Sequence, residues 1–247
     1  MAKRRKRARI LRSFRSVLIA AVVLAICAWV GCAYIQEHPQ DVPWTELQLD
    51  HPIGMFTGRK LAALSDDYPF CQNLMDQMAV AYVPLKPAGE GQCRRANNVR
   101  LTGANSERIR FATRDIAPSC PVAAALTIWE DQIVQPAAVR YFGVRAVSIR
   151  HLGSYNCRQV AGSERWSEHA TGNAIDIAAF TLADGKAISL TGHWHTNGPE
   201  SAFLRTIRDG SCDLFATVLS PDYNAAHADH FHLDQAKRGA MDYRLCR

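Results

Sequence analysis

The sequence predicts an α+β domain, with a small and mainly antiparallel sheet and flanking helices, behind one N-terminal transmembrane helix. Three observations predict this architecture. An uncharged, mostly apolar run occupies residues 17–35 of the 247-residue chain. Short stretches rich in β-branched and apolar residues, separated by turn signals, follow residue 144. A segment of helical period begins at Cys120 and supplies the sheet with a helical neighbour.

The first element is the apolar run, which we expect to be a membrane anchor. Residues 1–16 form a basic cytoplasmic segment, and residues 17–35 approach the roughly 20 residues that a spanning helix needs. Cations before the helix and none within it favour a cytoplasmic N-terminus. A cleavable signal usually has a shorter apolar region of about 7–15 residues, so we expect an uncleaved signal anchor, with a cleaved signal as the alternative.

The net charge of +6 originates in the basic segment. Removing its eight cations leaves 21 Lys and Arg against 23 Asp and Glu, a net charge of −2 for the rest of the chain. The basicity therefore orients a helix, and we expect no nucleic acid among the partners. The eight cations are Lys3, Arg4, Arg5, Lys6, Arg7, Arg9, Arg12 and Arg15.

Residues 36–60 contain Pro39, Pro43 and Pro52, show no sustained period, and are expected to form a tether. Residues 61–247 are enough for one domain with a single core. Its clearest helix begins with Ser119 as N-cap and Pro121 in the first turn. The apolar stripe of this helix, which we expect in the core, consists of Val122, Ala125, Leu126, Trp129 and Ile133. Pro136 interrupts the stripe, and Gly143 ends the segment that follows.

The remaining elements are mostly strands. Asp184-Gly185 is a turn signal between two of them, and residues 201–208 have the pattern of a short helix. The expected strands are Val144 to Ile149, Ala174 to Phe180, Ala187 to Leu190, Leu214 to Leu219 and His230 to Asp234.

Six cysteines follow the anchor, and an even number is typical of disulfides in an oxidising compartment. Six cysteines allow 15 connectivities. Among them we favour Cys71–Cys93, Cys120–Cys157 and Cys212–Cys246.

Two histidine-containing stretches provide the ligands of a zinc site. Zinc takes three or four N, O or S ligands, and a catalytic site leaves one position for water. Gly172 predicts a bend between His169 and Asp176, with Asp176 in the strand that follows. Further ligands come from the histidines at 227, 230 and 232. Those at 230 and 232 project to one face of a strand, so one can bind metal while the other faces substrate.

Asp229 precedes these two histidines and points away from them in an ideal strand. It therefore reaches the metal site only if the strand begins or bulges at this residue.

These stretches resemble the zinc D-Ala-D-Ala peptidases of the lysostaphin/Hedgehog superfamily and, more closely, the bacterial extensin-like C-terminal domain family. The resemblance covers roughly Cys71 to the C-terminus. It is carried by Cys120-Pro121-Val122-Ala123-Ala124-Ala125-Leu126, Ser154-Tyr155-Asn156-Cys157-Arg158, Ser167-Glu168-His169-Ala170-Thr171-Gly172-Asn173-Ala174 and Asp229-His230-Phe231-His232-Leu233-Asp234.

The resemblance implies a zinc peptidase-like fold and a role for each residue at the site. His169, Asp176 and His232 match the ligands of one catalytic Zn²⁺. Asp229 matches the catalytic acid/base, His230 the histidine that supports the developing oxyanion, and His227 its neighbour.

Two further residues are assigned to substrate binding. Arg158 matches an arginine that holds substrate, although two inserted residues separate it from the compact Gly-Tyr-Arg pattern of the peptidases. Ser167 is expected to hydrogen-bond within the His169 loop, and nothing in the sequence places a general base beside it that would make it a nucleophile.

From this resemblance we expect a single-pass protein of the bacterial inner membrane, with its C-terminal domain in the periplasm. The expected activity is hydrolysis of a peptide bond in peptidoglycan, so peptidoglycan or wall peptides are the expected partners. Two alternatives stay open: a zinc-containing domain that binds wall peptides without turnover, and a metal-free interaction module stapled by disulfides.

Overall fold

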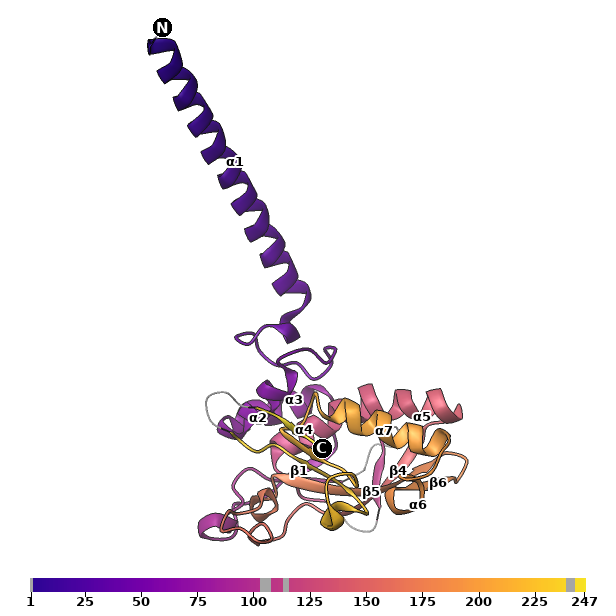
Figure 1. The fold of residues 1–247 in the computed structure, drawn as a ribbon. Helices are drawn as coiled ribbons and strands as arrows, with labels where there is room; N and C mark the ends of the chain where they lie inside the picture. Colours follow the sequence, from indigo (N-terminus) through magenta and orange to yellow (C-terminus); the bar gives the residue numbers. More distant parts are fainter. Residues whose placement is uncertain (1, 103–107, 113–115, 239–242) are drawn as a thin grey trace.

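Helix α1 (Ala2–Glu37) projects as a rod from the rest of the chain (Figure 1). The computed structural model describes residues 2–102, 108–112, 116–238 and 243–247. Within α1, the stretch Phe14–Glu37 has a mean hydropathy of 2.5 and its apolar window is not buried. The helix is therefore long and apolar enough to be a membrane anchor or a signal sequence.

The segment after α1 folds onto the domain sooner than its composition indicates. It contains the short helices η1 (Pro39–Asp41), α2 (Thr57–Ala63) and η2 (Leu64–Asp66). Leu47 and Leu49 are buried and belong to the main hydrophobic core. The Lys60 ammonium donates to the Pro39 carbonyl over 2.9 Å. The second half of the expected tether is thus packed against the domain.

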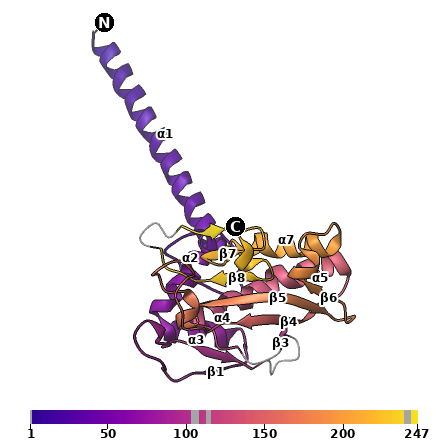
Figure 2. The ribbon, with the colours of Figure 1, turned by 60° about the horizontal axis from the view of Figure 1, so that its bottom comes forward.

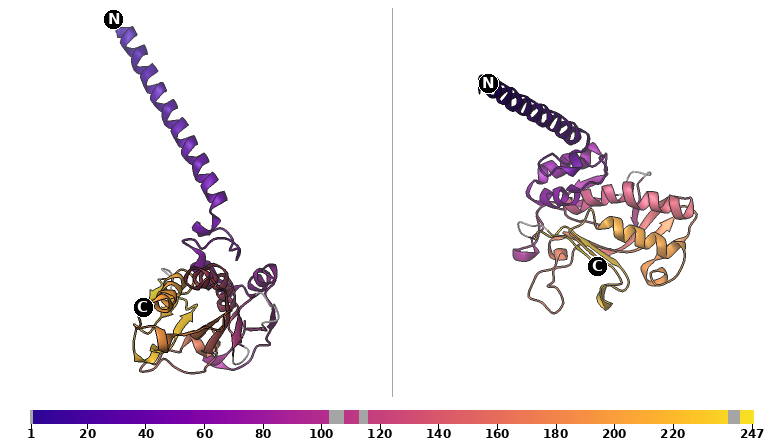
Figure 3. Two further views of the ribbon diagram at one scale, coloured as in Figure 1. Left: turned by 90° about the vertical axis from the view of Figure 1, so that its right-hand side faces the viewer. Right: turned by 45° about the horizontal axis from the view of Figure 1, so that its top comes forward.

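One helical layer covers one face of the main sheet (Figures 1 and 3). It consists of α3 (Tyr68–Gln77), α4 (Cys120–Trp129), the π-helical segment η4 (Glu130–Val134), α5 (Gln135–Phe142) and α7 (Pro199–Ser211). Trp129 is fully buried as predicted; its indole N–H donates to Ser211 Oγ over 2.7 Å and its ring lies 5.9 Å from that of Phe180. Burial of Trp129 therefore ties α4 to both α7 and the sheet.

Pro136 alters the helix without ending it. A proline lacks the N–H that an α-helical bond requires, and the π-helical segment directly precedes it. Helical structure then continues to Phe142, and Gly143 follows in the left-handed conformation at φ +71°, as the sequence predicts for a helix end.

The main sheet has seven strands and is larger than predicted (Figure 2). Its order is β3 (Arg110–Ala112), β4 (Ala146–Gly153), β5 (Ala174–Leu182), β8 (Phe231–Asp234), β7 (Thr217–Leu219) and β9 (Leu245–Cys246), with β6 (Ala187–Ser189) also paired to β5. The expectation of a small, mainly antiparallel sheet needs correction, because β3 pairs with β4 and β9 with β7 in parallel. These two edge strands have three and two residues, too few to show an alternating pattern.

The central strands agree with the predicted ones. The turn at Asp184-Gly185 joins β5 to β6, and β8 pairs antiparallel with the first half of β5. A separate two-stranded sheet joins β1 (Tyr82–Pro84) to β2 (Val99–Leu101). The short helices outside the helical layer are η3 (Gly91–Cys93), η5 (Glu168–Thr171), α6 (Leu190–His193) and η6 (Ala225–His227).

Three disulfides are present, and two of the three favoured pairings were wrong. The bonds join Cys71 to Cys120, Cys93 to Cys157 and Cys212 to Cys246. Only the last was expected. Cys71 is buried in α3, which packs directly against α4 and so brings it to Cys120. Pairing Cys71 with Cys93 and Cys120 with Cys157 failed because the packing of elements distant in the sequence, not proximity in the chain, decides which cysteines meet.

Candidate metal centre

The turn that carries His169 is shaped by Ser167 and Gly172. Ser167 is the N-cap of η5, and its hydroxyl oxygen accepts from the His169 backbone N–H over 3.3 Å. Gly172 ends the turn in the left-handed conformation at φ +73°. A Cβ at this position would lie 2.4 Å from Asn98 Nδ2, so a larger residue is excluded by space as well as by backbone conformation. The predicted bend is therefore present and tightly packed.

Asp176 and His232 meet across two neighbouring strands. Asp176 in β5 pairs directly with His232 in β8. The flanking residues of β5, Ile175 and Ile177, belong to the hydrophobic core, so Asp176 points to the opposite face of the sheet. The alternation of the two strands thus places a carboxylate and an imidazole together on the face away from the core.

Three donor atoms from these residues converge on one point. His169 Nε2 lies 3.1 Å from Asp176 Oδ1 and 3.1 Å from His232 Nδ1, and the last two atoms are also 3.1 Å apart. Bonds of about 2.0 Å at tetrahedral angles hold ligand atoms about 3.3 Å apart around zinc. The triangle therefore has the size of one face of a zinc coordination tetrahedron.

The other ring nitrogens are already hydrogen-bonded, so the converging nitrogens have lone pairs to offer a metal ion when both rings are neutral. His169 Nδ1 lies 3.1 Å from the Ser154 carbonyl, and His232 Nε2 lies 3.0 Å from Asp234 Oδ2. Both partners only accept, so these outer nitrogens carry the protons and the inner nitrogens of neutral rings carry lone pairs. Backbone carbonyls and carboxylates hold metal-binding histidines in the same way. The donor set fits Zn²⁺.

The electrostatics of the cluster favour a positive charge at its centre. Burial disfavours the Asp176 anion, but hydrogen bonds from and charges on His169 and His232 outweigh it and hold the pKa of Asp176 far below its usual range. Burial lowers the pKa of His232, whereas bonds to the carboxylates of Asp176 and Asp234 raise it to about 9. Positive charge between the three donor atoms, whether a proton on the inner nitrogen of His232 or a metal ion, is therefore stabilised by the carboxylates of Asp176 and Asp234.

His230 and Asp229 form a hydrogen-bonded pair beside the cluster. Because β8 begins at Phe231, neither residue is constrained by the strand. The Asp229 carboxylate lies 2.7 Å from His230 Nδ1, and His230 Nε2 lies 3.5 Å from Asp176 Oδ1. Asp229 is exposed, with 59% of its side chain accessible, whereas His230 is buried. His230 is thus the member of the pair that borders the three donor atoms.

His227 forms an outer wall of the site. Its ring lies 5.2 Å from that of His230 and 6.0 Å from that of His232, and Tyr223 packs against it at 5.5 Å. Burial, followed by the charges of the two neighbouring histidines, lowers the pKa of His227 to about 4. The His227 ring is therefore neutral at physiological pH and contacts the cluster by packing.

Arg158 lies in a loop that is anchored to the His169 turn. The Arg158 carbonyl accepts from the Ser167 N–H over 3.1 Å, and the Asn156 N–H donates to the His169 carbonyl over 2.9 Å. The Cys93–Cys157 disulfide holds the same loop to η3. Arg158 itself is exposed, and its positive charge contributes to the low pKa of His227, which places it within electrostatic range of the site.

Two supporting groups have no assigned role in the sequence interpretation. Asp234 follows His232 by two residues, so the period of a strand would have identified it as a neighbour on the same face. The Ser154 carbonyl has no sequence signal, because every residue carries the same backbone oxygen. All eight predicted site residues lie within or beside the cluster, and the three expected ligands are its centre.

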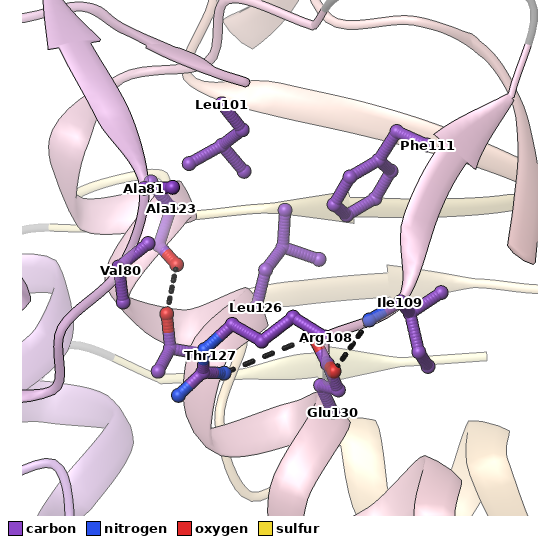
Figure 4. Close-up of a pocket in the computed structure, with 10 residues that line it drawn as sticks. All are labelled: Val80, Ala81, Leu101, Arg108, Ile109, Phe111, Ala123, Leu126, Thr127 and Glu130. Carbon is purple, nitrogen blue, oxygen red and sulfur yellow. Dashed lines mark hydrogen bonds and ion pairs between the residues drawn. The ribbon is translucent and has the colours of Figure 1, made fainter. Parts of the chain in front are cut away.

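A mainly apolar cavity lies away from the cluster, between the β1–β2 sheet, β3 and α4 (Figure 4). Its volume is about 40 Å³, and its charged residues are Arg108 and Glu130. The Glu130 carboxylate accepts from the Ile109 backbone N–H over 2.7 Å and lies 3.8 Å from Arg108. These contacts already supply the buried carboxylate with a donor and a counter-charge, so this cavity is a weaker candidate for chemistry.

Comparison with known proteins gives one match. A family model described as extensin-like protein C-terminus matches residues 69–247, which includes every residue of the cluster. No curated protein and no solved structure matches the chain.

Proposed function

The chain belongs to the family described as extensin-like protein C-terminus, and from this premise we propose that its domain is a zinc-dependent peptide hydrolase. The observation that carries the proposal is the convergence of three lone-pair donors within 3.1 Å of one another. Three protein ligands leave one position of a tetrahedral ion for water or substrate, as in catalytic zinc sites.

A zinc ion held by His169, Asp176 and His232 would supply an acidified water, with a pKa of about 7, and a Lewis acid for the substrate carbonyl. The protein's own task is to move protons and stabilise charge. Asp229 accepts the Nδ1–H of His230, which leaves the Nε2 lone pair of the neutral ring beside Asp176. The Asp229–His230 pair is therefore placed to take a proton at His230 Nε2 and return it to a leaving amine.

The exposed Arg158 guanidinium is the group that stabilises negative charge on the substrate. A well-placed donor of this kind contributes roughly 3–4 kcal/mol in comparable sites. Ser167 does not contact substrate in this mechanism, because its hydroxyl caps the His169 turn. It positions a ligand instead.

The substrate we propose is a peptide of the bacterial cell wall, hydrolysed in the periplasm. The eight cations that precede the apolar run 17–35 within α1 favour a cytoplasmic N-terminus, and three disulfides favour an oxidising compartment for the domain. A periplasmic domain tethered to the inner membrane faces peptidoglycan. The resemblance to zinc D-Ala-D-Ala peptidases supports the same substrate class.

The test is release of new amino groups from purified wall peptides by the wild type and by Asp229→Asn and His230→Gln variants. We expect both variants to keep zinc and lose about a hundredfold or more in kcat, the usual contribution of a positioned acid/base group. A wild type that binds wall peptides and zinc without releasing amines would replace the hydrolase with a binding domain.

A further inference from the structure

A polar cleft lies on the other side of the His169 turn, and we propose that it binds a protonated amino group of an amino acid or peptide. Its volume is about 340 Å³. Its polar lining comprises Ser65, Arg94, Asn97, Asn98, Ser119, Glu168, Thr171, Asn173, Gln235 and Lys237. The cleft contains none of the three predicted metal ligands, so the proposal does not rest on the proposed hydrolysis.

The amide nitrogens that line the cleft already donate to oxygens of the chain. Asn97 and Asn98 donate to backbone carbonyls over 3.1 and 3.1 Å, Asn173 donates to Glu168 Oε2 over 2.6 Å, and Gln235 donates to a backbone carbonyl over 3.0 Å. The backbone acceptors are those of Ser65, Ala117 and Leu214. These bonds also fix which end of each amide carries oxygen.

The hydroxyl groups of Ser119 and Thr171 also donate hydrogen bonds to oxygens of the chain. Ser119 donates to Asn173 Oδ1 over 2.7 Å, and Thr171 donates to the Glu168 carbonyl over 3.3 Å. Neither hydroxyl therefore has a proton to offer a ligand while these bonds persist.

By contrast, several side-chain oxygens that line the cleft accept no hydrogen bond from the described residues. Gln235 is fully buried, and its Oε1 has no hydrogen-bond partner among the described residues. Burying such an atom without a partner is unfavourable, because it has lost its hydrogen bonds to water. Within the part of the chain that the structure describes, Glu168 Oε1 and the side-chain oxygens of Asn97 and Asn98 also accept no hydrogen bond. The cleft thus offers four side-chain oxygens without donors, one of them a carboxylate oxygen, whereas its amide nitrogens and the hydroxyls of Ser119 and Thr171 each already donate within the chain.

Oxygens without donors favour a ligand that is rich in hydrogen-bond donors. An ammonium group offers three N–H donors and a positive charge, which complements several carbonyl oxygens and one carboxylate. Two nearby cations are already neutralised or engaged: Lys237 pairs with Asp66 at 2.5 Å, and Arg238 donates to the Ala216 carbonyl. The exposed Arg94 also lines the cleft, where it suits the carbonyl or carboxylate oxygen next to such an amino group.

Titration calorimetry with alaninamide and N-acetylalaninamide tests the proposal. The two probes differ in the ammonium group, and a chelator in the buffer prevents the amine from binding through a metal. We expect saturable binding of alaninamide alone, weakened about tenfold or more by Glu168→Gln, because hydrogen bonds to charged groups contribute about 1.5–3 kcal/mol. Glu164→Gln, an exposed carboxylate outside the cleft, should leave binding unchanged.

Three results would overturn the proposal: equal binding of both probes, no saturable binding of alaninamide, or binding unaffected by Glu168→Gln. Calcium binding by dialysed, chelator-free protein that does not bind alaninamide would indicate a hard-cation site and would also overturn it. If Glu168→Gln does not fold, Asn97→Ala removes another cleft oxygen and should weaken binding severalfold. Loss of zinc or of hydrolysis leaves this test unaffected.

Discussion

Two carboxylates that are largely shielded from solvent, Glu130 and Asp176, have opposite surroundings. Glu130 receives a backbone N–H and lies near the Arg108 guanidinium, so donors and a positive charge face it (Figure 4). Asp176 instead faces the inner nitrogens of two imidazoles whose outer nitrogens are hydrogen-bonded to other acceptors. Glu130 thus has a fixed donor and a fixed counter-charge, whereas Asp176 receives positive charge only from a proton or a metal ion that it shares with the imidazoles.

The pKa values of Glu130 and Asp176 shift in opposite directions, in agreement with their different surroundings. Burial raises the pKa of Glu130 to about 7, and the bond from Ile109 and the charge of Arg108 offset burial only in part. The pKa of Asp176 shifts downward despite its burial, because two imidazoles can place positive charge beside it. Burial alone therefore does not identify a functional carboxylate.

Asp176→Asn should have the largest effect. It keeps the shape of the side chain but removes the anion from the ligand triangle, so zinc affinity should fall by about a thousandfold or more. Supporting groups around metal ligands are typically worth about 10–100-fold, and a ligand should exceed them. Competition with a fluorescent chelator measures the affinity. Affinity equal to that of wild type would remove the distinction between the two carboxylates.

Glu130→Gln should change stability and leave zinc binding intact. The native pKa of about 7 lies above that of an unfolded glutamate, so the native state holds a proton that the unfolded state has lost. Stability from this group is therefore present below the unfolded value of about 4.5 and is lost as pH rises through 7.

Between pH 4.5 and 8 the wild type should lose about 3 kcal/mol more stability than the variant, because His227 and His232 titrate in both proteins. Urea unfolding at several pH values measures it, with Glu164→Gln as the exposed control. A pH slope as steep in Glu130→Gln as in the wild type would show that another group causes it.

Asp234→Asn should weaken zinc binding by about 10–100-fold, less than the loss of a ligand. The carboxylate accepts the outer N–H of His232, and an amide that replaces it makes a weaker bond and removes one buried anion. The same chelator competition applies. A loss as large as that of Asp176→Asn would mean that Asp234 itself ligates the metal.

Ser167→Ala should have the smallest effect. Loss of the N-cap oxygen costs about 0.5–2 kcal/mol of stability, and His169 should stay near the cluster because its ring still donates to the Ser154 carbonyl. Thermal unfolding measures the change. Complete loss of zinc in this variant would show that the cap, rather than the ring contact, sets the position of His169.

The sequence predicted the parts of the molecule that depend on local pattern. Gly172 and the period of the strands predicted that His169, Asp176 and a histidine of the 227–232 stretch lie together, and the family resemblance, rather than the local pattern, selected His232 among those histidines. The sequence did not predict β3 and β9, because these short strands form only by pairing with the edges of β4 and β7. It also did not predict the disulfide partners of Cys71 and Cys93, which depend on packing between distant elements. The sequence also could not predict that the Ser154 carbonyl accepts a hydrogen bond from His169, because this contact depends on the position of the backbone.

The metal content of the purified protein tests the central claim most directly. Atomic absorption should find about one zinc in each wild-type chain and in Glu130→Gln, and none in His232→Ala. The circular dichroism spectrum of each protein should show that it is folded. A folded wild type that takes up no zinc, or a His232→Ala variant that keeps it, would contradict the account.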